Sequence, residues 1–275
     1  MLEIDVSQGG QFGRAQFDNT LPLNPGEVVL TFDDGPLPHV TNKILRALAR
    51  HCAKATFFAV GKMALDAPDV MKRIAAAGHS IGTHTHSHPR DLRHHYNDYS
   101  RYQIERGFLE VASSAGRPIS AFFRYPGLHD EPKLNDYLTQ RKIANFSVDI
   151  IPGDTDGLSP ARIISRTLSQ LKRRGKGIIL LHDIKPATAR AMPRLLAALK
   201  ARGYKLVHIT SSQPFRPVAI EKLATKYGGL HHKNPKTIIG GKSYRQLYAE
   251  VDRKIRARQR KLFRVSKRKK WHKRR

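Results

Sequence analysis

Short runs of hydrophobic residues alternate with longer segments of mixed polarity along most of the chain. Seven runs have the length and composition of buried strands: 27–32, 55–60, 80–83, 121–124, 145–149, 177–181 and 204–209. The intervening segments predict five helices: 40–50, 69–77, 99–115, 159–173 and 188–202. Gly78 after the second helix and Ser159-Pro160 before the fourth are typical helix-end signals.

This repeated alternation predicts an α/β fold with parallel strands. The pattern by itself is compatible with a closed barrel and with an open doubly wound sheet. We expect three regions: an irregular N-terminal lead-in at 1–25, one α/β domain at 26–211, and a basic C-terminal extension at 212–275 that is partly helical or disordered. No run approaches the roughly 18 apolar residues of a membrane span, and residues 1–13 lack the apolar centre of a secretory signal.

The charge of the chain is extreme and uneven. Its 275 residues carry a formal net charge of +28, and basic residues dominate the extension. Such a field favours an anionic polymer or a membrane surface as a partner; nucleic acid, which would stack on Trp271, is less favoured. The single cysteine, Cys52, excludes an intrachain disulfide, and we expect it to be buried. The oligomeric state is not predicted.

Two adjacent carboxylates, Asp33 and Asp34, follow the first predicted strand and precede Gly35-Pro36. Carboxylates buried close together repel each other, and a nearby cation removes that cost. Because neighbouring residues point in different directions, one carboxylate can bind a cation while the other faces a substrate. The alternative is a surface turn, since Asp, Gly and Pro all favour turns.

Three histidines, His84, His86 and His88, follow the third predicted strand at spacings of two. Neutral imidazole is the commonest metal ligand, and histidines combined with a carboxylate suit zinc. His84 and His88 are four residues apart and share a face in a helical turn, whereas His86 points elsewhere. The alternative is a polar loop without a ligand.

Other strand ends carry single candidates. Arg124 precedes a Pro-Gly turn and can orient a carboxylate through a two-pronged bond. His182 ends the most hydrophobic strand, where it is placed for general acid–base chemistry. Asp149 and Asp154 flank another strand end, and either one can orient His182. Because the carboxyl ends of parallel strands meet at one face, we expect these side chains to converge.

Taken together and in this order, the clusters resemble the motifs of the polysaccharide deacetylase family, carbohydrate esterase family 4. The stretch at 31–36 looks like the family's first motif, and that at 84–89 looks like its second, His-Thr-x-x-His. Leu181-His182 looks like the last motif. The stretch at 124–127 is a looser match to Arg-x-Pro-x-Gly, and Thr155 stands where a tryptophan usually follows the aspartate.

The resemblance implies a distorted (β/α) barrel with about seven parallel strands. It implies a hydrolase that removes N-acetyl groups from an N-acetylglucosamine-containing carbohydrate, of the chitooligosaccharide or peptidoglycan type, and releases acetate. It also implies Zn²⁺, or another divalent metal such as Co²⁺ or Mn²⁺, bound by Asp34, His84 and His88. The cell envelope or periplasm is the compartment that the resemblance suggests.

The resemblance further implies a role for each remaining candidate. Asp33 would be the general base and His182 the general acid. Arg124 would orient Asp33, and Asp149 or Asp154 would orient His182. The competing hypothesis is a metal-dependent amidase that uses the same centre on a non-sugar amide.

Overall fold

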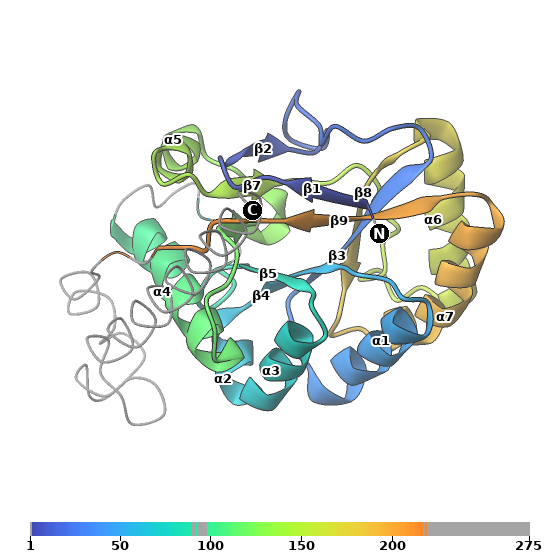
Figure 1. Cartoon of the computed structure of the whole chain (residues 1–275), viewed down its shortest axis with the longest axis horizontal. Coiled ribbons are helices and arrows are strands. Elements are labelled where there is room, and N and C mark those ends of the chain that lie inside the picture. Colours follow the sequence, from blue (N-terminus) through green and yellow to red (C-terminus); the bar gives the residue numbers. More distant parts are fainter. Residues whose placement is uncertain (1, 90–91, 93–97, 217, 219–275) are drawn as a thin grey trace, which may run out of the picture.

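The structure is a computed structural model that describes residues 2–89, 92, 98–216 and 218. Most of the predicted basic extension, including Trp271, therefore lies outside the described residues. Figure 1 shows strands at the centre of the described part and helices around them.

The strands pair in parallel throughout and form one sheet that curves into a barrel. Their bounds are β1 (Leu2–Asp5), β2 (Gly10–Phe12), β3 (Glu27–Asp33), β4 (Thr56–Ala59), β5 (Ser80–Thr83), β6 (Phe122–Phe123), β7 (Ala144–Phe146), β8 (Gly177–His182) and β9 (Lys205–Thr210). The order runs β1-β9-β3-β4-β5-β6-β7-β2, and β8 pairs with β3. A parallel bridge between Ile150 and Ile179 connects the stretch after β7 to β8 and closes the ring. The predicted parallel barrel is confirmed, and β3 to β9 supply its seven expected strands.

Helices cover the outside of the barrel. Their bounds are α1 (Pro38–Arg50), α2 (Gly61–Asp66), α3 (Pro68–Ala76), α4 (Asp98–Ala115), α5 (Pro132–Gln140), α6 (Pro160–Arg174) and α7 (Pro186–Ala201), with a short 3₁₀ turn at Pro126–Leu128. Proline opens most of these helices, a position where its missing N–H is not needed. No described helix is long and apolar enough to cross a membrane.

The barrel has two apolar layers because alternate strand residues face opposite sides. In β3, Leu30 and Phe32 pack towards the helices, whereas Val29 belongs to the cluster that fills the barrel. Phe122 and Phe146 pack inside it with ring centroids 5.1 Å apart. Asp33 is buried at the end of β3. By the same alternation it points inward with Val29, so one end of the interior is polar.

The structure differs from the sequence expectation in several places. The lead-in is not irregular throughout: it contains β1, which pairs with β9, and β2, which pairs with β7. These strands are short and lie at the sheet edges, where the hydrophobic pattern is weak. The helices α2 and α5 were not predicted, because six and nine residues are too few to show a clear period. Cys52 is exposed rather than buried, since it sits in the turn that follows α1.

Candidate active site

The candidate side chains come from four strands that end at the same rim of the barrel. Asp33 is the last residue of β3 and His182 the last of β8, while His84 and Arg124 directly follow β5 and β6. The parallel register aligns Asp33 with His182. Because these strands end at one rim, the barrel brings together residues that lie up to about 150 positions apart in the sequence.

Asp34, His84 and His88 offer one ligand atom each, all within 4.8 Å of one another. Asp34 Oδ1 lies 3.6 Å from His84 Nε2 and 3.2 Å from His88 Nε2. Asp34 Oδ1 is buried, and within the described chain no donor forms a hydrogen bond to this oxygen. A buried acceptor without a donor costs free energy, which a cation between these three atoms would remove. The donor set therefore fits a divalent metal, with one carboxylate and two imidazoles.

The backbone directs these ligands towards one another. Asp34 has a φ of 74° and His88 a φ of 53°, both in the left-handed region that few non-glycine residues adopt. At Asp34 the turn separates the directions of the two adjacent aspartates. Such strained residues cluster at functional sites, where the surrounding structure holds them in place.

Hydrogen bonding fixes the tautomer of His84. Its Nδ1 lies 2.8 Å from the carbonyl oxygen of Arg124, and a carbonyl can only accept, so Nδ1 carries the proton. Nε2 is thereby left with a free lone pair that faces Asp34. Burial lowers the pKa of His84, which favours the neutral form that a metal requires.

The charges around Asp34 are also suited to a cation. Burial by itself would raise the pKa of Asp34, but the neighbouring imidazoles of His88, His84 and His182 lower it to about 2. The carboxylate of Asp34 in turn raises the pKa of His88. Asp34 is therefore ionised at any pH at which the protein would act.

Asp33 has a different environment, because a buried arginine holds it. Arg124 Nη1 donates to Asp33 Oδ1 at 2.7 Å and to the Thr31 hydroxyl at 2.8 Å, while Nε and Nη2 donate to the backbone oxygens of Phe146 and Ser147. The guanidinium carbon lies 4.3 Å from the centroid of the Phe58 ring. Asp33 Oδ2 remains directed at the metal-ligand cluster, 3.9 Å from His84 Nε2.

His182 is held by Asp154. Its Nδ1 lies 2.8 Å from Asp154 Oδ1, and its backbone N–H donates to Asp154 Oδ2 at 2.8 Å. Thr188 donates a further bond to the same carboxylate. Burial would lower the pKa of His182, but the hydrogen bond and charge of Asp154 outweigh it and raise that pKa.

Asp149, the other candidate for orienting His182, lies elsewhere. Its two carboxylate oxygens accept the backbone N–H groups of Arg14 and Ile178. These bonds attach the N-terminal lead-in to the start of β8. Asp149 is therefore placed for a structural role, and Asp154 is the carboxylate that contacts His182.

A buried polar network behind the loop of His84 and His88 was not predicted from the sequence. His86 Nδ1 lies 2.6 Å from Glu110 Oε2, and Arg106 Nε donates to the other oxygen of Glu110 at 2.6 Å. Gln103 adds two contacts, accepting from His86 N through its backbone and from Ser87 N through its side chain. The available signal was the set of polar residues on α4 at positions where a helix packed on the barrel would be apolar.

A second missed group is Asp183, which is buried directly after His182. Thr41 donates to its Oδ2 at 2.7 Å, and burial together with the charge of Asp34 raises the pKa of Asp183 to about 7. A Cβ on Gly35 would lie 2.1 Å from its carboxylate oxygens. The loop after β3 therefore needs glycine at this position.

This fold and site define an α/β-barrel hydrolase with an Asp-His-His cluster beside a second carboxylate and a histidine. The family model described as polysaccharide deacetylase matches residues 21–144. A peptidoglycan-N-acetylglucosamine deacetylase of Bacillus cereus is 33% identical over 198 residues, which cover 69% of each chain. The chain belongs to the polysaccharide deacetylase family, carbohydrate esterase family 4.

Two further comparisons agree with this assignment. A chitooligosaccharide deacetylase of Azorhizobium caulinodans is 29% identical over 197 residues, 66% of this chain and 92% of that protein. The solved structure of a peptidoglycan deacetylase from Bdellovibrio bacteriovorus has a TM-score of 0.67 and 33% identity. The match covers 77% of this chain and 58% of that one, so this chain spans somewhat more than half of that structure.

Proposed function

We propose that this chain is a divalent-metal-dependent deacetylase that hydrolyses the N-acetyl group of N-acetylglucosamine in a glycan. The observation that carries the proposal is the unpartnered Asp34 Oδ1 facing the Nε2 atoms of His84 and His88. Asp33 and His182 approach this cluster, each with its own ordering partner. Substrates of the peptidoglycan and chitooligosaccharide type are supported by the names of the relatives.

The chemistry needs a water activated for attack and an acid for the departing nitrogen, because an acetamide is inert. A divalent ion at Asp34, His84 and His88 would lower the pKa of a water molecule and polarise the acetyl carbonyl. Asp33 would take the proton of the attacking water, and Arg124 holds one oxygen of this carboxylate while the other is directed at the cluster. His182 would donate a proton to the sugar nitrogen as it leaves. The products are acetate and a free amine.

Zinc is the metal that this donor set suits best, with Co²⁺ and Mn²⁺ as alternatives. A cell-envelope location follows from the wall glycans named for the relatives. The competing activity is hydrolysis of a non-sugar amide by the same centre.

The test is acetate release from three groups of substrates: peptidoglycan fragments, chitooligosaccharides and small N-acetylated amides. Each is measured after chelation and after addition of Zn²⁺, Co²⁺ or Mn²⁺. We expect release from a glycan that is abolished by the chelator and restored by a divalent metal. Release from small amides alone would favour the amidase, and full activity in the chelator would exclude metal dependence.

The ligand assignment is tested by metal content. His84→Ala is expected to lose bound metal, while the exposed control His51→Ala keeps it. Full occupancy of the His84→Ala variant by elemental analysis would contradict the assignment.

A further inference from the structure

A cationic pocket lies at the opposite end of the barrel from the candidate active site. It has a volume of about 260 Å³, and its lining includes Arg14, Asp149, Arg173, Arg174, Lys176 and Gly177. Gly177 is the first residue of β8 and His182 the last. At about 3.3 Å per residue, the pocket lies about 16 Å from the catalytic rim.

The charge balance of the pocket is strongly positive, with four cations against one carboxylate. Both oxygens of that carboxylate, Asp149, accept backbone N–H bonds, and the four cations less this one carboxylate leave a formal charge of +3. Within the described chain, the guanidinium groups of Arg14 and Arg174 have neither a hydrogen-bond acceptor nor an acidic partner. Lys176 donates to the Leu23 carbonyl, which leaves two of its three N–H groups available.

A further acidic group, Glu27, interacts with the charge of Lys176, and its carboxylate already has hydrogen-bond donors. Its carboxylate accepts both the backbone and the side-chain N–H groups of Asn24. These bonds, with the charges of Lys205 and Lys176, lower the pKa of Glu27. Glu27 therefore offsets part of the charge of Lys176, and within the described residues it forms no ion pair with an arginine of the pocket.

Helix electrostatics explain only part of this cluster. Arg173 and Arg174 lie in the last turn of α6, where the helix dipole favours cations. Arg14 comes from the loop after β2 and Lys176 from the approach to β8, so neither serves that dipole. Three separate segments thus direct cations into one hollow.

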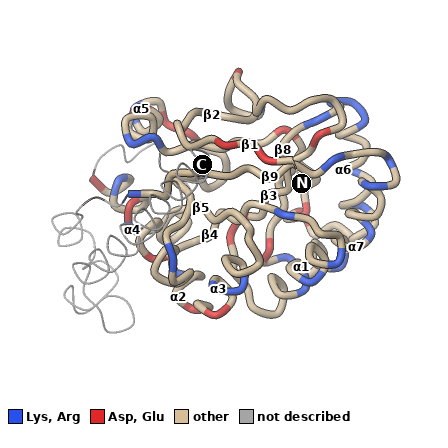
Figure 2. Tube along the Cα trace, in the orientation of Figure 1, with Lys and Arg blue, Asp and Glu red and all other residues tan. Residues whose placement is uncertain are grey.

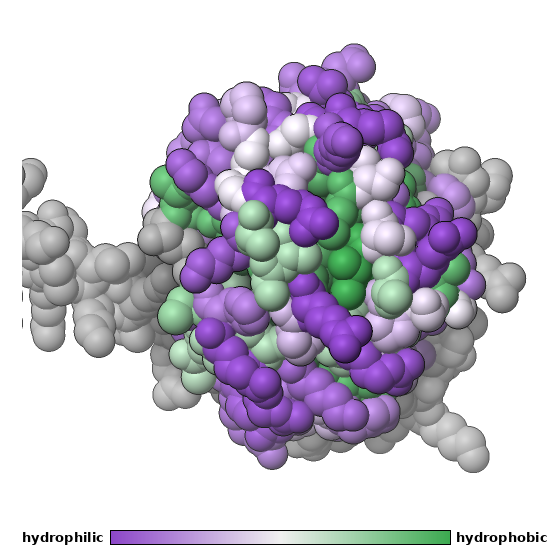
Figure 3. All heavy atoms as spheres, turned by 90° about the vertical axis from the view of Figure 1, so that its right-hand side faces the viewer, coloured by the Kyte–Doolittle hydropathy of each residue, from purple (hydrophilic) through white to green (hydrophobic). Residues whose placement is uncertain are grey.

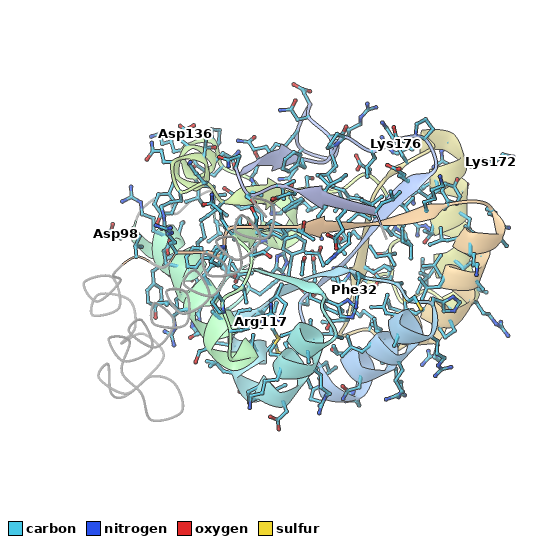
Figure 4. The ribbon with its side chains drawn as sticks, in the orientation of Figure 1. Phe32, Asp98, Arg117, Asp136, Lys172 and Lys176 are labelled. Atoms are coloured by element: carbon cyan, nitrogen blue, oxygen red, sulfur yellow. The ribbon has the colours of Figure 1, made fainter. Side chains whose placement is uncertain are left out.

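The pocket belongs to an end of the molecule that is rich in basic residues. Lysines and arginines gather along α1, α6 and α7 (Figure 2). Lys172, in the last turn of α6, and Lys176, just after this helix, lie at this end (Figure 4). Viewed from this side, hydrophilic side chains surround a narrow hydrophobic strip (Figure 3).

We propose that the pocket is an anion-binding exosite that takes a phosphate group, either free or carried as a monoester on a sugar. Guanidinium forks bind phosphate through paired charge-assisted hydrogen bonds, and several cations suit its double charge better than the single charge of a carboxylate. The Thr20 hydroxyl adds a neutral donor, and Leu21 and Leu23 give an apolar floor to a bound sugar. The volume fits one such group.

The experiment is calorimetric titration of the full-length, metal-loaded protein with inorganic phosphate, glucose 6-phosphate and glucuronate at low salt. The test variant is Arg14→Gln/Arg174→Gln. The matched control is Arg190→Gln/Arg194→Gln, which removes the same charge from exposed positions on α7. Inorganic phosphate and glucose 6-phosphate distinguish a free from a sugar-borne phosphate.

The expected result is that phosphate binding weakens about tenfold or more in the test variant, from the loss of charged hydrogen bonds, and little in the control. Equal weakening in both variants, or none in either, would overturn the proposal. The proposal would also be overturned if glucuronate bound as tightly as glucose 6-phosphate and its binding were lost in the same test variant.

Deacetylation and thermal unfolding provide independent readouts. Acetate release from neutral N-acetylglucosamine oligomers and the unfolding temperature are expected to be unchanged in the test variant, because both arginines are exposed and distant from the rim. The binding measurement does not depend on catalysis, so a failure of the proposed deacetylase activity would leave this test intact.

Discussion

Asp33 and Asp34 are adjacent and chemically identical, yet their environments differ. Asp33 is fixed by Arg124, while Asp34 faces two imidazoles without a hydrogen-bond donor. Identical side chains can therefore take different parts in the reaction, one as base and one as ligand. The positive φ of Asp34 produces this division, because it turns consecutive side chains apart.

The first prediction separates these two roles. Asp33→Asn is expected to lower turnover by at least about 100-fold, because an amide cannot accept the water's proton. Metal content should be unchanged, since Asp33 is not in the ligand cluster. The measurements are acetate release and elemental analysis, with the exposed Asp156→Asn as control. Wild-type turnover in Asp33→Asn would remove it from the base role.

The second prediction concerns pH. Asp154 raises the pKa of His182, so His182 remains protonated to higher pH and loses its proton as the pH rises through that value. A general acid acts only when protonated, so if His182 has this role we expect activity to fall on the alkaline side. Asp154→Asn is expected to move the alkaline limb of kcat/KM to lower pH.

Asp149→Asn is the matched control for that pH profile, because Asp149 does not contact His182. Its alkaline limb should stay where the wild-type limb lies. An unmoved limb in Asp154→Asn, or an equal shift in both variants, would contradict the assigned pairing.

At the level of elements, α4 is unusual because it buries charged residues against the barrel. Glu110 and Arg106 form one buried pair, and Glu110 also bonds His86, which lies in the sequence between the two candidate ligands His84 and His88. Partners behind metal ligands fix ligand orientation. The helix is thus placed to act as a frame for the loop, although none of its residues is in the ligand cluster.

The third prediction tests this frame. Glu110→Gln weakens the bond to His86 and is expected to lower metal affinity by about 10-fold or more. Glu105→Gln is the matched control: Glu105 is equally buried on α4, but its partners are Tyr137 and Arg141. The measurement is metal titration of both variants. Equal metal affinities of Glu110→Gln and Glu105→Gln would show that Glu110 contributes only to stability.

At the level of the whole molecule, the buried acid Asp183 links stability to pH. Its folded pKa of about 7 lies above the ordinary value of 3.8. Between these values the unfolded chain is ionised and the folded chain is protonated, so stability falls as the pH rises. The loss is complete above the folded pKa and amounts to at most about 4 kcal/mol.

The fourth prediction follows from that slope. In chelated protein, the unfolding free energy of Asp183→Asn relative to wild type should increase from pH 4 to 7 and then level off. The measurement is denaturant unfolding at several pH values. A difference between the two proteins that is independent of pH would exclude Asp183 as the titrating group.

Much of the fold was readable from the sequence because local patterns suffice for it. The runs at β3 and β8 are continuous and hydrophobic, as expected of strands buried on both sides, and Ser159-Pro160 marks the start of α6. The edge strands β1 and β2 and the helix α2 were not readable, because they are short and their stability comes from neighbours distant in sequence.

For the site, the sequence by itself determined which residues are candidates for the chemistry: Asp33, Asp34, His84, His88 and His182 are recognisable from residue type, spacing and position after strands. Only the tertiary structure decided the pairings. Asp154 rather than Asp149 contacts His182, and Glu110 bonds His86. Arg14 and Arg174, from distant parts of the sequence, line the same pocket. Residue type and spacing are encoded locally, whereas a contact between strand ends depends on how the barrel closes.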